Sequence, residues 1–189
     1  RDAKVLKKRL PMALIHEAAG TVLHDAKGNF KTGQKVILLP NIPGKDLRYD
    51  ENYRLDSRFR SSKADGFMQE IVALPESQIV AYDHIPLQVA AFTEFISVGV
   101  HAVKSYMKRK NRKPESIGVW GDGGLGYIIC TLIKHYYPET KVTIMGVNRE
   151  KLDMFQFVDD ICLVDELDCS RAQFDDVFEC VGGQRSEEH

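Results

Sequence analysis

A glycine-rich turn, residues 121–126 with the sequence GDGGLG, lies between a short apolar run and a longer apolar segment. This G-x-G-x-x-G spacing between a predicted strand and a predicted helix is typical of loops that bind the pyrophosphate of a dinucleotide. Gly121 would make the tight turn, Gly123 would let the backbone approach the phosphates, and Gly126 would let helix and strand pack closely. The free N–H groups at the start of the helix would then face the diphosphate. We therefore predict a cofactor-binding loop, and its residues are Gly121, Gly123, Gly124, Leu125 and Gly126. The alternative is a plain strand-to-helix turn.

The predicted strand after this loop, residues 141–146, lacks an acid that NAD-selective dinucleotide folds usually carry about 20 residues beyond the glycines. Gly146 stands near that place, and Asn148, Arg149 and Lys151 follow it. A guanidinium pairs with a 2′-phosphate that a carboxylate would repel. The pattern favours NADPH over NADH as the cofactor, and the exposed start of a helix is the alternative reading of these side chains.

Three acid or imidazole side chains are candidates for metal chemistry. His16 is followed by Glu17, and Glu94 lies in a strongly apolar segment that is predicted to be helical. A buried carboxylate is costly unless it is paired or coordinated, so a metal ion or an arginine would compensate Glu94. The His16–Glu17 pair alone is more typical of an ordinary satisfied pair than of a metal site.

Composition limits the classes of function. The 189 residues are 43% hydrophobic and 28% charged with a net charge of -1, which is a globular composition and favours neither nucleic-acid nor anionic-membrane binding. No apolar run approaches the roughly 20 residues that span a bilayer. The four cysteines show no C-x-x-C spacing, and we expect reduced thiols in a cytoplasmic protein at Cys130, Cys162, Cys169 and Cys180.

The order of the predicted elements indicates an α/β fold in two parts. The first part is mostly β, with a long polar loop at 41–65 and strands expected at 21–23, 35–40, 66–75 and 78–82. A helix is expected over 86–113, and strands and helices then alternate, with a helix at 149–158 and strands at 141–146, 161–164 and 176–181. Only one of the two βαβαβ halves of a dinucleotide-binding sheet is present, so we expect a segment of a longer protein.

In this order the candidate residues resemble the zinc-dependent medium-chain dehydrogenase/reductase family. The resemblance rests on His16-Glu17 at the start of a β-module, on Glu94 ahead of the SVGVHA segment at 97–102, on the glycine loop, and on FECVGG at 178–183. The order is similar to the polyol dehydrogenase branch, in which the third zinc ligand is a Glu. It is most similar to the ribulose-5-phosphate reductases, at residues 10–17, 65–68, 80–83 and 93–95.

The resemblance implies a truncated GroES-like catalytic β-domain over residues 1–83, followed by the first half of a Rossmann nucleotide-binding domain over 84–189. It implies a catalytic Zn²⁺ held by His16 and Glu94, with Glu17 as a ligand or a neighbour of the metal. The family's first ligand is a cysteine that would precede Arg1, and none of the four cysteines here replaces it. We therefore expect the zinc site of this segment to be incomplete and the segment itself to be inactive.

The implied activity is reduction of D-ribulose 5-phosphate to D-ribitol 5-phosphate by NADPH with zinc assistance, which supplies CDP-ribitol for teichoic acid or capsule. A sugar phosphate needs cations, and in the long polar loop we select Arg54, Arg58 and Arg60, with a solvated loop as the alternative. Two other functions stay open: another zinc-dependent polyol or sugar dehydrogenase, and a non-catalytic NADP-binding partner of a nucleotidyltransferase. The implied partners are a second copy in a homodimer and a ribitol-5-phosphate cytidylyltransferase.

Overall fold

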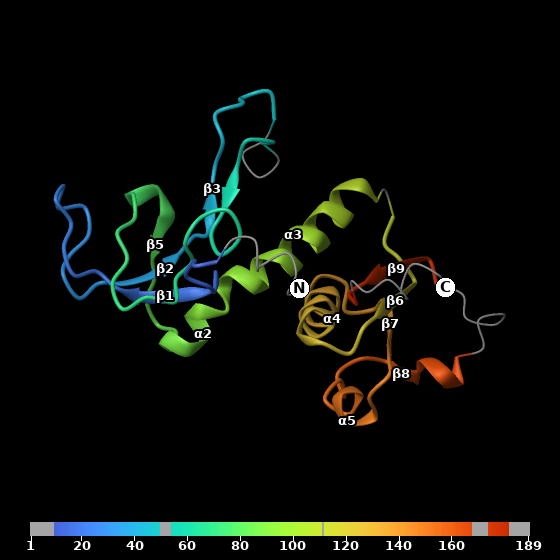
Figure 1. Ribbon diagram of the computed structural model, residues 1–189. Helices are drawn as coiled ribbons and strands as arrows, with labels where there is room; N and C mark the ends of the chain where they lie inside the picture. The colour runs from blue at the N-terminus through green and yellow to red at the C-terminus, as the bar shows by residue number, and fades with distance from the viewer. Residues whose placement is uncertain (1–9, 50–53, 111, 168–173, 182–189) are drawn as a thin grey trace. The chain divides into compact units, whose positions relative to one another are not determined.

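The computed structural model describes residues 10–49, 54–110, 112–167 and 174–181 (Figure 1). The chain packs as two compact units, Arg1–Phe95 and Ile96–His189. Within the described residues, no helix combines the length and the apolar character needed to cross a membrane.

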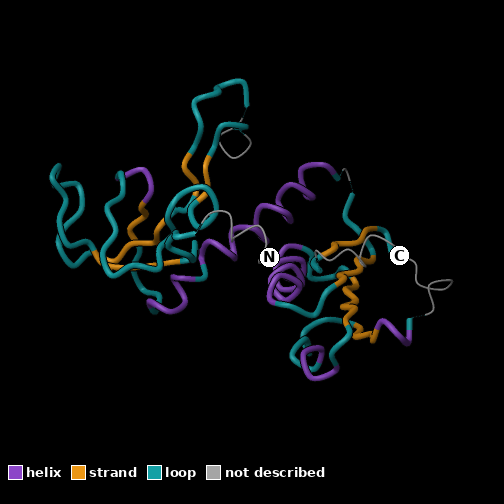
Figure 2. The backbone as a smooth tube through the Cα atoms, in the orientation of Figure 1, coloured by secondary structure: helices purple, strands orange, loops and turns teal. Residues whose placement is uncertain are grey.

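The first unit is organised around a three-stranded antiparallel sheet in the order β1-β2-β5. The strands are β1 (Ala18–Thr21), β2 (Lys35–Leu38) and β5 (Ile79–Ala81), and a 3-10 turn, η2 (Glu76–Gln78), leads into β5. Figure 2 shows that loops make up much of this unit. The central strand carries its core, since Val36 and Ile37 are buried. The first strand lies earlier than the predicted 21–23, because Ala18 to Thr21 pair with β2.

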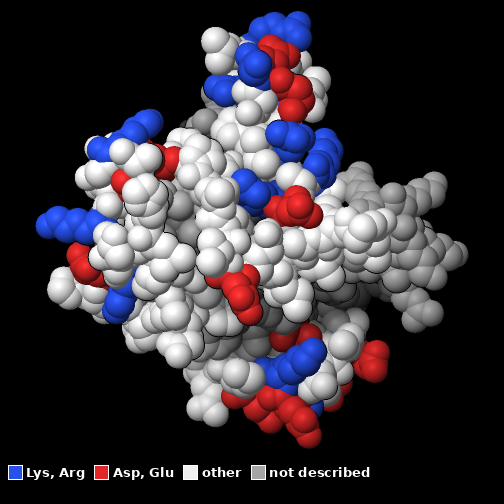
Figure 3. All heavy atoms as spheres, turned by 60° about the vertical axis from the view of Figure 1, so that its left-hand side comes forward, with Lys and Arg blue, Asp and Glu red and all other residues white. Residues whose placement is uncertain are grey.

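The long polar loop of residues 41–65 contains a short antiparallel ladder between β3 (Asn41–Ile42) and β4 (Arg58–Phe59). Beyond this ladder the chain forms an arm. In Figure 3 basic and acidic side chains are intermixed at its tip, where Arg48 donates two side-chain hydrogen bonds to Asp46. This local pairing engages the Arg48 guanidinium within the arm.

The prediction of a strand over 66–75 is wrong, because the structure has no strand there. The N–H groups of Gly66, Phe67 and Met68 donate to the carbonyls of residues 13, 15 and 14 in an order that no regular ladder follows. The segment is therefore held against the chain ahead of β1 by irregular hydrogen bonds.

The helix predicted over 86–113 is present as two helices, α2 (Leu87–Ala91) and α3 (Thr93–Arg109). They are separated by Phe92, which caps α2 with φ −80° and ψ −2°. The two packing units divide inside α3, so Glu94 in its first turn belongs to the first unit. The domain boundary expected between residues 83 and 84 stays a prediction.

The second unit is a four-stranded parallel sheet in the order β8-β7-β6-β9 with helices along it. Its elements are β6 (Ser116–Trp120), α4 (Gly124–Tyr136), β7 (Lys141–Gly146), α5 (Arg149–Leu152), β8 (Asp160–Leu163), η3 (Val164–Glu166) and β9 (Asp176–Glu179). The central strands read as continuous apolar runs because both faces of a parallel sheet are covered. Their fully buried residues, with those of the helices, make the core: Val103, Ile117, Val119, Ile129, Cys130, Ile133, Val142, Ile144, Leu152 and Phe155.

The helix α5 is shorter than the predicted 149–158 and ends at Leu152. The N–H groups of Met154 and Phe155 donate three residues back, to Lys151 and Leu152, so the chain tightens into turns. These turns place the Phe155 ring, which is 2% exposed, in the core of the unit. Tertiary packing of one aromatic side chain thus replaces the expected two further helical turns.

Asp159 joins α4 to β7, which gives the stability of this unit a predictable pH dependence. Its carboxylate accepts the Val142 N–H at 2.7 Å and the Lys134 ammonium at 3.0 Å. Desolvation raises the pKa of this carboxyl, but these donors outweigh it and hold the pKa below the ordinary 3.8. A lowered native pKa means that the stabilisation is present above the unfolded-state pKa and is lost as the pH falls through the native one.

We therefore expect Asp159→Asn to lower the free energy of unfolding near neutral pH by about 1 kcal/mol, a value reduced for solvent screening. Urea unfolding of both proteins should show this gap closing as the pH falls below about 3.8. Asp160→Asn is the control, because the Asp160 carboxylate pairs with the largely exposed Lys141 ammonium. A gap that stays constant down to the acid limit would contradict this role of Asp159.

Candidate functional site

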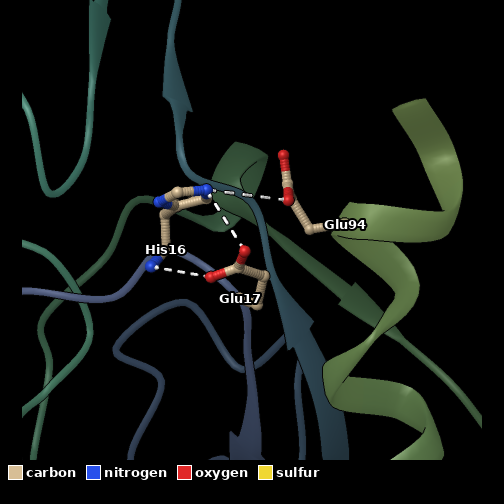
Figure 4. Close-up of side chains that lie close together, drawn as sticks. All are labelled: His16, Glu17 and Glu94. Atoms are coloured by element: carbon tan, nitrogen blue, oxygen red, sulfur yellow. Dashed lines mark hydrogen bonds and ion pairs between the residues drawn. The ribbon is translucent and has the colours of Figure 1, made fainter. Parts of the chain in front are cut away.

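Three side chains from two distant segments meet in the first unit (Figure 4). His16 and Glu17 come immediately before β1, and Glu94 comes from the first turn of α3. The His16 Nε2 lies 3.3 Å from Glu17 Oε1 and 4.0 Å from Glu94 Oε2. When one potential ligand atom is taken from each of the three residues, these atoms all lie within 4.8 Å of one another. The structure therefore brings together the three residues that the sequence indicated separately.

The electrostatics of this cluster favour a bound cation. The Glu94 side chain is 14% exposed. Desolvation raises its carboxyl pKa, the His16 ring opposes this rise, and the neighbouring Glu17 charge adds to it. A positive ion between the two carboxylates would relieve both the desolvation and the repulsion.

The donor set fits zinc. Imidazole nitrogen and carboxylate oxygen are both zinc ligands, with bonds of about 2.0–2.2 Å, so donors this close reach one ion after small side-chain rotations. Three protein ligands with an open fourth position are typical of catalytic rather than structural zinc. The cluster contains no cysteine among the described residues. Of the predicted free thiols, Cys130, Cys162 and Cys180 carry no disulfide, and Cys169 lies outside the described residues.

Ser61 and Phe59 contact the His16 ring, and sequence reasoning missed both. The Ser61 hydroxyl lies 3.0 Å from His16 Nδ1, and the Phe59 ring meets the imidazole edge-on at 5.1 Å. Ser61 is 7% exposed. Ser61 and Ile15 both have positive φ, 59° and 66°, which is uncommon for residues other than glycine. Such backbone conformations gather at functional sites, and here Ile15 precedes His16 while Ser61 contacts its ring.

We expect Ser61→Ala to lower the zinc affinity of the full-length protein by about 10- to 100-fold, as losses of groups that orient a metal-binding histidine commonly do. If the Ser61 hydroxyl accepts from Nδ1–H, it favours the tautomer that leaves Nε2 free for a metal. Zinc binding measured in competition with a chromophoric chelator tests this. Ser62→Ala is the matched control, since its hydroxyl donates to the Phe59 carbonyl instead. Equal affinities for all three proteins would contradict the role of Ser61.

A cavity of about 490 Å³ opens beside Glu17. Its remaining lining residues are apolar: Ile15, Ala91, Phe92 and Phe95. The volume suits a small organic substrate. The wall is mostly apolar and carries one carboxylate, which is available for a polar contact.

The arginines of the long polar loop differ in how their side chains are engaged. Arg54 donates to the Gly44 carbonyl. Arg60 donates to the Asp65 carbonyl and to Gln78, and its guanidinium lies over the Phe67 ring. Arg58, on β4, is exposed, and its guanidinium has no hydrogen-bond or ion-pair partner among the described residues. A substrate-phosphate role for the three arginines stays a prediction, and Arg58 is the one whose charge is free to meet it.

The glycine loop of the second unit forms a tight turn that leads from β6 into α4. Gly121 follows β6 with φ 125° and donates its N–H to the Met145 carbonyl at 2.8 Å. A Cβ at Gly126 would overlap the Gly121 carbonyl oxygen, whereas a Cβ at Gly123 would meet no atom within 4 Å. Gly123 caps α4 without any side-chain hydrogen bond, so the first N–H groups of α4 are left for another acceptor. Gly124 starts this helix, and Leu125 packs against the core.

The three residues expected near the 2′ position of the cofactor lie after β7, at the N-cap and in the single turn of α5. Asn148 caps α5, with its side chain accepting the Lys151 N–H at 3.1 Å. Arg149 lies 3.4 Å from Asp153 in an exposed ion pair, which costs little to break. Asp122, which sequence reasoning passed over, accepts hydrogen bonds from the N–H groups of Val147 and Asn148. The cofactor roles of these residues and of the glycine loop stay predictions.

Comparison with known proteins adds close relatives. No model of a known protein family matches the chain. The chain is 43% identical over 189 residues to ribulose-5-phosphate reductase 1 of Staphylococcus aureus, a match that covers 99% of this chain and 55% of that protein. It is also 43% identical over 185 residues to ribulose-5-phosphate reductase of Streptococcus pneumoniae, covering 97% of this chain and 53% of that protein. The chain thus spans about half the length of the curated relatives it matches.

Solved structures agree with this fold. S. aureus TarJ in complex with NADPH matches with a TM-score of 0.77 and 36% identity, covering 99% of this chain and 52% of that one. L-idonate 5-dehydrogenase of Escherichia coli matches in fold, with a TM-score of 0.81 and 24% identity over 94% of this chain and 55% of that one. The predicted α/β class, a GroES-like β part followed by the first half of a Rossmann domain, is confirmed. The chain belongs to the medium-chain dehydrogenase/reductase family.

Proposed function

We propose that the protein containing this chain reduces D-ribulose 5-phosphate to D-ribitol 5-phosphate with NADPH and a zinc ion. The observation that carries the proposal is the convergence of His16, Glu17 and Glu94 beside a small cavity. The names of the 43% identical relatives support the substrate, and the TarJ complex supports the cofactor. The product would supply CDP-ribitol for teichoic acid or capsule.

In this proposal the chain's own residues bind the metal and shape the space around it. His16 and Glu94 would hold zinc, which when bound supplies Lewis-acid polarisation of a carbonyl oxygen. Glu17 has a 37% exposed side chain and lines the cavity, so its carboxylate can be a further ligand or pass a proton to solvent. The apolar wall, with Phe92 and Phe95, would offer apolar contacts to the substrate.

The second unit would bind and orient the cofactor, which supplies a hydride. The N–H groups at the start of α4 would donate hydrogen bonds to the pyrophosphate, and Gly123 would let the backbone approach it. Arg149, released from its exposed pair with Asp153, would meet the 2′-phosphate. Only the 2′-phosphate distinguishes NADPH from NADH, so this contact carries the preference.

Arg149→Ala should therefore weaken NADPH binding by about tenfold, the value of one charge-assisted contact, and leave NADH binding nearly unchanged. Nicotinamide fluorescence titrations of the full-length protein with each cofactor measure this directly. Arg109→Ala is the control, because that side chain donates to the Ser105 carbonyl within α3. If the wild type and Arg149→Ala both prefer NADH, the 2′-phosphate argument fails.

The function itself is tested by metal analysis and an NADPH-oxidation assay of the full-length protein. We expect stoichiometric zinc and oxidation of NADPH with ribulose 5-phosphate, and much slower oxidation with unphosphorylated ribulose. Absence of zinc, or of oxidation with ribulose 5-phosphate, would overturn the proposal. Turnover with a different sugar or polyol would support the alternative of another dehydrogenase of this family.

NADPH binding without turnover would instead support a non-catalytic partner of a nucleotidyltransferase.

We further propose a homodimer that associates with a ribitol-5-phosphate cytidylyltransferase in the cytoplasm, because the product of one reaction is the substrate of the next. Size-exclusion chromatography with light scattering, alone and with that enzyme, tests both associations. A monomer that elutes separately from the cytidylyltransferase would contradict them.

A further inference from the structure

Asp122, the second residue of the glycine loop, fastens that loop to the chain that leaves β7. Its Oδ2 accepts the Val147 N–H at 2.9 Å and the Asn148 N–H at 2.8 Å. One carboxylate oxygen therefore fixes two successive peptide groups immediately after the last residue of β7. This is a geometry in which a negative charge is balanced by backbone dipoles.

The same side chain fills the space beside Gly146. A Cβ on Gly146 would lie 2.5 Å from the Asp122 Cβ, 2.8 Å from its Cγ and 2.6 Å from its Oδ2. Real Cβ atoms do not approach other atoms so closely, so any larger residue at position 146 must displace Asp122. The aspartate in the glycine loop thus requires a glycine at the end of β7.

Position 146 stands near the place where NAD-selective folds carry their acid. An Asp or Glu there would overlap Asp122 and would set two carboxylates side by side, which disfavours the charged form of both. Asp122 therefore excludes the residue type that would select NADH. The turn at 147–148 leads directly into Asn148, which caps α5, and into Arg149. By holding this turn, Asp122 also fixes the positions of these two residues.

We propose that Asp122 is a positioning residue for cofactor selectivity: it closes position 146 to an acid and holds the turn that presents Arg149. The proposal rests on the proposed NADPH site, and it adds that the choice of cofactor is set from the glycine loop rather than from β7 alone. Asp122 itself touches no reacting atom in this account.

The test compares NADPH and NADH affinities of the full-length wild type, Gly146→Asp, Asp122→Ala/Gly146→Asp and Asp122→Asn by nicotinamide fluorescence titration. Gly146→Asp alone should weaken the binding of both cofactors by about tenfold, since the clash would break at least one hydrogen bond that holds the turn. Adding Asp122→Ala should recover NADH binding but not NADPH binding. Asp122→Asn should bind NADPH like the wild type, because its amide oxygen can accept the same two N–H groups. A Gly146→Asp protein that binds NADH as tightly as the double variant would overturn the proposal.

Amide hydrogen exchange tests the fastening without any cofactor. In Asp122→Ala the amides of Val147 and Asn148 should exchange about tenfold faster than in the wild type, and in Asp122→Asn they should not. Glu150→Ala, which changes an exposed acid in the same segment, is the matched control. Unchanged exchange in Asp122→Ala would overturn the fastening. A wild type that binds neither cofactor would overturn the proposed NADPH site, and with it the selectivity role, while the exchange result would still decide the fastening.

Discussion

Replacing Glu94 with alanine should lower the zinc affinity of the full-length protein by more than about 100-fold, beyond the effect of losing a group that only orients a ligand. Glu94 reaches the cluster from α3, whereas His16 and Glu17 are neighbours ahead of β1. Without Glu94 the cluster keeps donors from one short segment only. NADPH oxidation with ribulose 5-phosphate should fall with the zinc content.

The stability of the metal-free protein separates this role from a structural one. Burial raises the pKa of the Glu94 carboxyl, so its charge is costly in the folded state. Metal-free Glu94→Gln should therefore unfold at a temperature no lower than that of the metal-free wild type. Glu70→Ala is the matched control, since Glu70 is an exposed carboxylate of the same unit. A Glu94→Ala protein that keeps stoichiometric zinc and full activity would remove Glu94 from the ligand set.

The parallel sheet could be predicted from the sequence because its signals are local. The strand at 141–146 appears with the predicted bounds, and the glycine loop leads from β6 into the first turn of α4 as its spacing indicated. The first unit was harder, because its strands are short and its loops hold each other by irregular hydrogen bonds. The expected strand at 66–75 failed for this reason, since its apolar residues serve contacts with residues 13–15 instead.

The candidate metal cluster could be predicted in part. His16 and Glu94 carry a chemical signal, namely an imidazole beside a carboxylate and a carboxylate in an apolar segment. Ser61 carries none, because its contact with the His16 ring depends on a turn 45 residues away. Asp122 was visible in the glycine loop, but its bonds to Val147 and Asn148 depend on how β6 and β7 pair.

Gly126 and Gly123 should differ in how the same substitution changes the free energy of unfolding, although both belong to one motif. A Cβ at Gly126 would overlap the Gly121 carbonyl oxygen, which is backbone and cannot rotate away. We expect Gly126→Ala to lower the free energy of unfolding by about 3 kcal/mol or more, at the upper end of overpacking penalties. Because the turn must open to make room, NADPH binding should be lost as well.

Gly123→Ala supplies the contrast, because its φ of −91° suits any residue and its Cβ would meet no atom within 4 Å. The substitution should leave the free energy of unfolding unchanged or raise it by about 0.5 kcal/mol through the unfolded state. It should nevertheless weaken NADPH by about tenfold, since the added methyl occupies the approach of the pyrophosphate. Urea unfolding and fluorescence titration of both variants measure the two effects separately. A Gly123→Ala protein with undiminished NADPH affinity would show that the phosphates do not pass over this residue, and the loop would then be a structural turn alone.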